Sequence, residues 1–258
     1  MKKILLSLFL VAIIILGIYI FNTQSQLHHY INTKINIPTT STTIDEAQEA
    51  AILITDKAIY EDKNNYIIDV HYPVTQNKII DDNIFSNIKK QIDDFMVAVA
   101  EPSPNSAKTT LIISYETIFN QDDVLSIKFA SEAYTGGAHP SHLIWTKNFA
   151  TSESTEIPFE EVVIDEIMLN SISKYAIKNL TAQKQDYEFF MEGLEPNKTN
   201  YQTFALNDKG IIFYFNEYQI APYYAGNFEL LMPYEDIDIS GLENIEASEE
   251  IQEINIDQ

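Results

Sequence analysis

The sequence contains neither cysteine nor arginine among its 258 residues. The absence of cysteine excludes disulfide bonds, a thiol nucleophile, thiolate metal ligands and a lipid-modified bacterial lipoprotein N-terminus. All 16 basic residues are lysines and they face 38 acidic residues, so the formal net charge is −22. Such a charge disfavours nucleic acid as a partner and favours encounter with cationic proteins, although it also serves plain solubility.

Long apolar runs are also scarce, and the single exception lies at the N-terminus. Residues 4–21 carry no charge and follow Lys2 and Lys3. A helix of this length measures about 27 Å, close to the hydrocarbon thickness of a bilayer. We expect a transmembrane anchor or an uncleaved signal, with residues 1–3 as a short cytoplasmic end. A cleaved signal peptide is the alternative, because Thr23 and Ser25 offer a weak cleavage site.

The positive-inside rule places the rest of the chain outside the cytoplasm, in the periplasm or at the cell surface. Residues 22–50 are rich in Asn, Thr, Gln and Ser and are interpreted as a flexible linker, which includes His28 and His29. The chain is 45% hydrophobic, enough for a full core, and residues 51–240 are assigned to one extracytoplasmic domain. Residues 241–258 are interpreted as a solvated acidic tail.

Hydrophobic periodicity within residues 51–240 predicts an α+β fold, in which an antiparallel β-sheet is packed by two to three α-helices. The three strands at 109–119, 124–130 and 142–149 follow one another through short turns, so we expect them to be antiparallel neighbours. The other predicted strands cover 52–55, 66–73, 203–206, 210–215 and 228–234. Helices are predicted at 83–100 and 158–180, with a possible third at 186–192.

Two motifs stand out between these elements. The first is Tyr-Thr-Gly-Gly-Ala-His-Pro-Ser at residues 134–141, and the second is the run from Phe213 to Gly226 that contains Asn-Glu-Tyr-Gln-Ile-Ala-Pro-Tyr-Tyr-Ala-Gly. Together with residues 148–149 and 157–161, they resemble the extracytoplasmic domains found in the anti-sigma factor RsiV and beside the catalytic domain of the peptidoglycan deacetylase PdaC. The resemblance covers residues 53–237.

The resemblance implies an α+β domain outside the membrane, and in RsiV this domain binds lysozyme. It does not imply an enzyme, because the family domain lies outside the deacetylase module of PdaC and no such module follows here. Only residues 1–3 precede the apolar segment, so anti-sigma activity is not expected either. The implied partners are lysozyme or another cationic protein, or peptidoglycan, and no cofactor is implied.

The two motifs supply the candidate binding residues, on the hypothesis that their loops meet on one surface. Tyrosines would give such a surface large contact area with a polar group at the end of each ring. The alternative is a structural role, in which the same residues form tight turns and the edge of the core. The candidates are Tyr134, Gly136, Gly137, His139, Tyr218, Pro222, Tyr223 and Tyr224.

Two enzymatic alternatives use the histidines. His71, His139 and His142 could hold zinc, with Glu132 or Glu217 as base, but on one strand His139 and His142 would point to opposite faces. Ser141 beside His139 could form a hydrolase pair that acts on the wall, but no nucleophile elbow surrounds it. We therefore assign neither catalytic nor metal-binding residues and expect His139 to fix its own loop. A further alternative is an envelope assembly protein without a soluble ligand.

Overall fold

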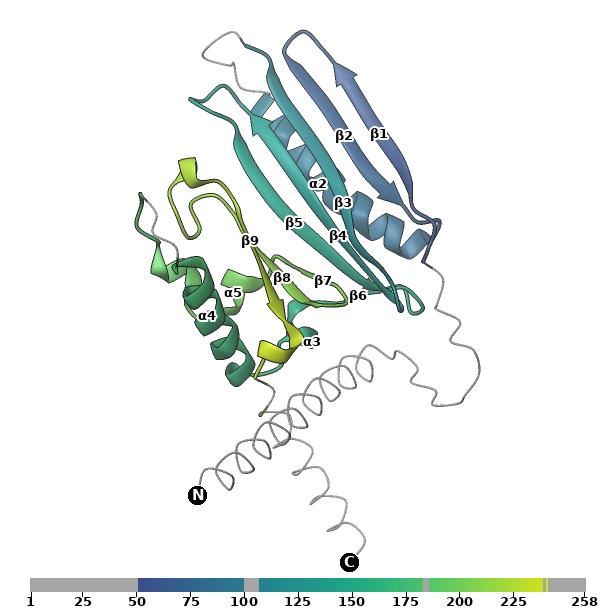
Figure 1. Ribbon diagram of the computed structural model, residues 1–258. Helices are drawn as coiled ribbons and strands as arrows, with labels where there is room; N and C mark the ends of the chain where they lie inside the picture. The colour runs from purple at the N-terminus through teal and green to yellow at the C-terminus, as the bar shows by residue number, and fades with distance from the viewer. Residues whose placement is uncertain (1–50, 100–106, 183–185, 239, 241–258) are drawn as a thin grey trace, which may run out of the picture.

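The computed structural model describes residues 51–99, 107–182, 186–238 and 240 (Figure 1). The predicted anchor, the whole linker and the acidic tail lie outside these residues. Within the described ranges, no helix is both long and apolar enough to cross a membrane. The described chain forms a mixed α+β fold with a six-stranded sheet and a separate three-stranded sheet.

The larger sheet has its strands in chain order. They are β1 (Thr55–Asp62), β2 (Tyr66–Val74), β3 (Thr109–Gln121), β4 (Val124–Tyr134), β5 (Ser141–Ala150) and β6 (Thr155–Glu156). The expected antiparallel pairing of β3 with β4 and of β4 with β5 is confirmed. The prediction of a purely antiparallel sheet is wrong, because β2 and β3 are parallel. The helix α2 (Lys78–Val99) connects them, and a crossover of this length returns the chain in the same direction.

Helix α2 covers one face of this sheet, behind the strands in the view of Figure 1. Its fully buried residues Ile80, Ile84 and Ile88 recur at intervals of four, which places them on one face of a helix. They pack against alternate residues of the strands, and the cluster includes Val70, Ile113, Leu125, Ile127 and Phe129. The helix predicted at 83–100 is confirmed, but it begins earlier, at Lys78, so that Ile80 extends the buried face.

The C-terminal half builds the second layer. It contains α3 (Phe159–Val162), α4 (Glu166–Leu180), the 3₁₀ turn η1 (Met191–Leu194), α5 (Lys198–Tyr201) and the antiparallel strands β7 (Phe204–Leu206), β8 (Gly210–Phe215) and β9 (Phe228–Pro233), with the 3₁₀ turns η2 (Tyr223–Ala225) and η3 (Tyr234–Asp236) before and after β9. Asp165 begins α4 by accepting a hydrogen bond from the backbone N–H of Met168 (2.8 Å). Every residue of β8 is buried, so this strand forms the centre of the second core.

The two halves meet through a buried polar contact between β7 and the larger sheet. The Asn148 side chain donates to the carbonyl of Phe204 (2.9 Å) and accepts from the Ser126 hydroxyl (2.7 Å). The hydroxyl oxygen of Ser126 in turn accepts from the backbone N–H of Leu206 (3.1 Å). These side chains satisfy backbone groups at the edge of β7, which would otherwise be buried without partners.

Two local predictions are wrong. Residues 52–54 precede the first strand, which instead runs from Thr55 through Asp62. The sequence shows no hydrophobic alternation here, because most residues of this edge strand are exposed and several are charged. The predicted helix at 186–192 is absent from residues 186–190 and is replaced by the short turn η1.

Candidate functional site

The loop between β4 and β5 meets the loop between β8 and β9. The ring of His139 stacks on the ring of Tyr223 with centroids 3.8 Å apart. The Tyr223 hydroxyl donates to the carbonyl of Pro140 (3.1 Å). We call the surface formed by residues 134–142 and 216–227 the two-loop surface.

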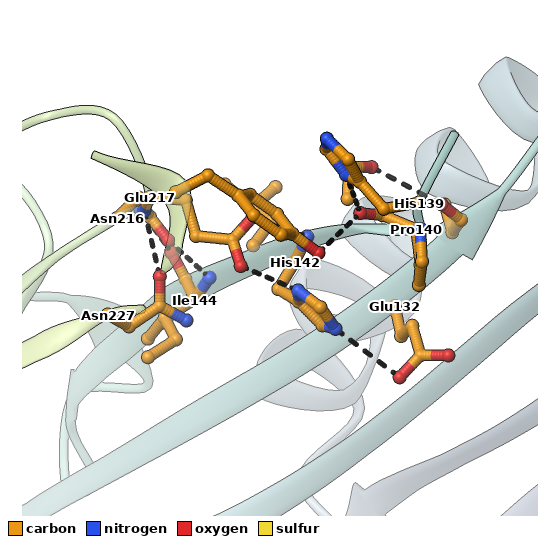
Figure 2. A network of polar contacts seen from close by, with 12 residues as sticks. Glu132, His139, Pro140, His142, Ile144, Asn216, Glu217 and Asn227 are labelled. Carbon is orange, nitrogen blue, oxygen red and sulfur yellow. Dashed lines mark hydrogen bonds and ion pairs between the residues drawn. The ribbon is translucent and has the colours of Figure 1, made fainter. Parts of the chain in front are cut away.

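Asn216 fastens the second loop to the free side of β5 (Figure 2). Its side chain accepts from the N–H of Ile144 (2.6 Å) and donates to the carbonyl of the same residue (3.0 Å). A side-chain amide that makes this pair of bonds replaces the backbone of a neighbouring strand. Glu217 extends the arrangement, because its carboxylate accepts from the N–H of His142 (3.2 Å), two residues earlier on β5.

His142 lies between two carboxylates (Figure 2). Its Nδ1 is 2.6 Å from Glu217 Oε1, and its Nε2 is 3.5 Å from Glu132 Oε2 on the neighbouring strand. The Glu217 side chain is only 10% exposed, whereas that of Glu132 is 43% exposed. A buried carboxylate that accepts from Nδ1–H fixes the orientation of the ring and leaves Nε2 toward solvent and Glu132. Asn227 completes the support by accepting from the backbone N–H of Glu217 (2.8 Å).

Tyr218 is the most unusual residue of the two-loop surface. Its backbone has φ of 63°, in the left-handed region that a tyrosine rarely adopts. Burial of the side chain does little to offset this backbone strain, since Tyr218 is 58% exposed. The ring lies 5.7 Å from that of Tyr223, so Tyr218, Tyr223 and His139 form a row of aromatic rings at the surface. Desolvation, followed by the charge of Glu217, raises the pKa of Tyr223.

Tyr224 faces a different group of rings. It is 67% exposed and contacts Tyr187 (6.0 Å between centroids), which also contacts Phe189 and Phe228. The adjacent residues Tyr223 and Tyr224 therefore hold η2 between the β4–β5 loop and the segment before η1. Pro222 precedes the turn in an extended conformation.

The glycines of the two motifs differ in their backbone needs. Gly136 has φ of 95° and Gly226 has φ of 73°, conformations that other residues adopt only with strain. Gly137 has no positive φ, and a side chain there would meet only the carbonyl of His139 at 3.8 Å. Tyr134 ends β4, where it pairs with Thr110, and it is half-buried at the base of the loop.

The enzymatic alternatives find little support in this geometry. His71 lies on β2, three strands from β5, where it contacts Asp56 and Asp69. In the part of the chain that the structure describes, no group of three or more His, Asp or Glu side chains is placed to hold a metal ion. The argument that His139 and His142 would point to opposite faces of one strand does not apply, because β5 begins only at Ser141 and the rings of both histidines lie near Tyr223.

His139 also makes the contact within its own loop that we expected of it. Its Nδ1 lies 2.8 Å from the carbonyl of Pro140. The Ser141 hydroxyl instead donates to the carbonyl of Ala133 (3.4 Å). Both side chains thus hold the loop. The supporting residues Asn216 and Asn227 are not among the candidates predicted from the sequence. Their one local signal is that polar residues come directly after the wholly apolar strand β8 and directly before β9.

Comparisons with known proteins match both halves of the fold. Residues 59–142 match the family model described as Deacetylase PdaC, and residues 161–235 match the family model described as Protein of unknown function (DUF3298). The first match spans β1 to the start of β5 and includes α2, and the second spans α4, α5 and the smaller sheet. The two-loop surface is therefore made by both matched regions.

One curated relative and two solved structures extend these matches. The chain is 26% identical over 184 residues to the peptidoglycan-N-acetylmuramic acid deacetylase PdaC of Bacillus subtilis (strain 168). This region is 69% of the present chain but 38% of that enzyme, so the chain spans well under half of its relative.

Among solved structures, a DUF3298 family protein of Pseudomonas aeruginosa PAO1 has a TM-score of 0.50 at 13% identity, over 74% of this chain and 93% of that one. A member of the same family from Bacteroides fragilis NCTC 9343 has a TM-score of 0.47 at 18% identity, over 72% and 93%. A PdaC-type region followed by a DUF3298 region, together with the PdaC relative, supports a PdaC/DUF3298-type domain family for this chain.

Proposed function

We propose that this chain is an extracytoplasmic binding domain of a bacterial cell envelope, tethered to the membrane through residues 4–21, and that a cationic protein such as lysozyme binds its two-loop surface. The relation to a peptidoglycan deacetylase supports a role at the cell wall. The resemblance to the lysozyme-binding domain of RsiV supports the class of ligand. The observation that carries the proposal is the stack of His139 on Tyr223, which joins two loops beside the carboxylates of Glu132 and Glu217.

The charges next to the two-loop surface fit a cationic partner. The strand register places His142, Glu132, Ile112, Asp69 and Tyr60 in one row across the sheet face opposite α2. Glu132 and Asp69 are each 43% exposed on this row. Lys128, which lies farther along β4 and is 21% exposed, is paired with Glu116. Exposed tyrosines beside acidic groups supply the aromatic anchors and the attraction that a protein interface uses.

Calorimetric titration of the chain in detergent micelles with lysozyme tests this proposal. We expect saturable, stoichiometric binding that persists at about 0.15 M salt, because diffuse attraction between opposite charges is strongly screened there. Tyr223→Ala should weaken binding at least about tenfold, as loss of a central aromatic anchor does. Phe85→Ala is the matched control, since Phe85 is an exposed aromatic residue on α2, on the opposite face of the sheet.

Absence of binding, or binding that the moderate salt abolishes, would reject a protein ligand of this kind. Equal affinity of the Tyr223→Ala and Phe85→Ala variants for lysozyme would instead support lysozyme as the ligand but contradict its binding at the two-loop surface. Binding of the chain only to membrane neighbours in a pull-down would favour an envelope assembly protein.

A cell-wall glycan is the second candidate ligand. Two observations favour it, namely the peptidoglycan substrate in the name of the related enzyme and the exposed ring of Tyr218 beside Tyr223. Sugar rings stack on aromatic faces, and carboxylates such as Glu132 accept bonds from sugar hydroxyls. Titration with soluble peptidoglycan fragments should then show binding that Tyr218→Ala reduces, whereas lysozyme would show none. Turnover of these fragments that is lost in His139→Ala would point to the hydrolase alternative.

A further inference from the structure

The two long edges of the six-stranded sheet are treated differently. On the β5 side, Asn216 and Glu217 bind the backbone of Ile144 and His142, and the Thr146 hydroxyl accepts from the N–H of Phe204 (3.1 Å). On the other side β1 is the last strand, and no described element lies beside it (Figure 1). Its eight residues continue without a bulge or proline and are mostly exposed. An edge of this kind is a template for pairing with another strand.

The hydrogen-bond pattern of the β1–β2 hairpin identifies which residues of β1 present free backbone groups. Lys63 N–H donates to the carbonyl of Tyr66 (2.9 Å), which makes this a hydrogen-bonded pair. Such pairs alternate along antiparallel strands, so the odd-numbered residues of β1 bond to β2. Pro73, which has no N–H, lies opposite Asp56, in agreement with this alternation. The N–H and C=O groups of Asp56, Ala58, Tyr60 and Asp62 therefore point away from the sheet.

We propose that β1 pairs with β1 of a second copy of this chain, antiparallel and centred on Ile59, so that the two larger sheets become continuous. A two-fold axis at Ile59 places Ala58 opposite the partner's Tyr60. The outward-pointing N–H and C=O groups of one copy then face those of the other. It also places Ile59 against the same residue of the second copy. The interface is isologous, as in most homodimers.

Charge selects this register over its neighbours. With the axis at Ile59, Lys57 lies opposite the partner's Glu61 on the face that carries α2, and the pair occurs twice. An axis at Ala58 places Lys57 opposite an isoleucine, and an axis at Tyr60 places it opposite a lysine. Opposite charges directly across a strand pair are favourable, whereas like charges are unfavourable.

The same register brings Asp56 opposite the partner's Asp62. Each of these carboxylates already has a basic partner within its own copy, and the hydrogen bond to Asp56 raises the pKa of His71. Asp56 lies 2.9 Å from His71 Nδ1, and Asp62 is paired with Lys108. These basic partners reduce the repulsion between Asp56 and the partner's Asp62, at the Asp56 end when His71 is protonated, which leaves the Lys57–Glu61 pairs to set the register.

Single cysteine variants test the pairing, because the chain has no cysteine of its own. In this register residue 59 forms a non-hydrogen-bonded pair with itself, with Cα atoms about 4.5 Å apart, which a disulfide can bridge. The full chain with Ile59→Cys, oxidised in detergent micelles at about 0.15 M salt, should therefore form a covalent dimer. A mixture of Lys57→Cys and Glu61→Cys chains should form the mixed dimer in preference to either homodimer.

Two variants control for collision and for folding. Val97→Cys lies on α2 and is 73% exposed, so its dimer yield measures chance encounter in the same micelles. Ala58→Pro added to Ile59→Cys removes an outward N–H and leaves the bonds to β2, so it should lower the yield at least about tenfold. Circular dichroism of each variant checks that the fold is retained.

A yield for Ile59→Cys no higher than that for Val97→Cys overturns the proposal, and so does preferential cross-linking in another register. Mass spectrometry that finds the Ile59→Cys chain joined through its thiol to a different polypeptide would also overturn it, because the edge would then receive another partner. Since β1 lies four strands from β5, this result is independent of ligand binding at the two-loop surface.

Discussion

Glu217 holds His142 at two points, through the ring Nδ1 at 2.6 Å and the backbone N–H at 3.2 Å. The two residues come from different halves of the fold, since His142 lies on β5 and Glu217 follows β8. One carboxylate thus closes part of the β5 edge and orients a histidine of the two-loop surface. Stability and the shape of the surface are coupled through this contact.

Removal of the Glu217 carboxylate should destabilise the protein. Glu217→Ala leaves the N–H of His142 without its partner, and we expect a loss of about 2 kcal/mol in the free energy of unfolding. Glu217→Gln keeps one acceptor oxygen, so its loss should be about 1 kcal/mol. Urea unfolding followed by the fluorescence of Trp145, the single tryptophan and a residue of β5, measures both. An unfolding midpoint for Glu217→Ala equal to that of Glu160→Gln, a change at an exposed glutamate, would contradict the expectation.

Tyr218→Gly should separate stability from binding. Glycine adopts a φ of 63° freely, so the substitution relieves backbone strain and should stabilise the fold by about 1 kcal/mol after its entropy in the unfolded chain is counted. The same change removes an exposed ring and should weaken ligand binding. Tyr218→Phe keeps the ring and the strain and should leave stability unchanged. Thermal unfolding of the three proteins measures the effect, and if Tyr218→Gly destabilises the protein, the ring has a structural role instead.

Much of the fold could be predicted from the sequence, because local patterns record burial. The patterns of residues 109–119 and 124–130 predict two neighbouring strands, which run on to Gln121 and Tyr134 in the structure, and the spacing of Ile84 and Ile88 marks the buried face of α2. No local pattern predicts the parallel pairing of β2 with β3, because this pairing depends on where helix α2 returns the chain to the sheet. The separation into two sheets is equally hidden, because each strand has the same local pattern in either sheet.

The candidate site was predicted only in part, for a related reason. Glycine, proline and tyrosine in two motifs are sufficient to propose two loops, and the structure brings His139 and Tyr223 into contact. The residues that support this contact, Asn216 and Asn227, act on backbone groups that approach only in the folded protein. A single sequence contains no information about such distances.

Gly193 is a further position whose need for glycine is visible only in the structure. A Cβ atom there would lie 2.0 Å from the carbonyl oxygen of Gln219, in the loop that carries Glu217. Gly193→Ala should therefore shift that loop and destabilise the fold by about 2 kcal/mol. Gly137→Ala is the matched control, because its added methyl group meets ordinary contact distances. Equal thermal midpoints for the two variants would show that the loop accommodates the methyl group without strain.

Alkaline pH should unfold the protein partly through Tyr201. Burial raises the pKa of Tyr201 to about 12 from the usual 10.0, and its hydroxyl donates to the carbonyl of Leu194 (2.7 Å). The unfolded chain releases this proton first, so the stabilisation is complete below about pH 10 and is lost as the pH rises from about 10 toward about 12, by an amount on the order of 2 kcal/mol. Tyr201→Phe should lower stability at neutral pH by about 1 kcal/mol through the lost hydrogen bond.

The same variant should make stability depend less on pH above about 10, because no proton remains to be released at this position. Urea unfolding of both proteins at several values between about pH 9 and about pH 12 measures the two slopes. Parallel slopes would assign the alkaline transition to other buried tyrosines such as Tyr214 and Tyr234, whose pKa values burial also raises.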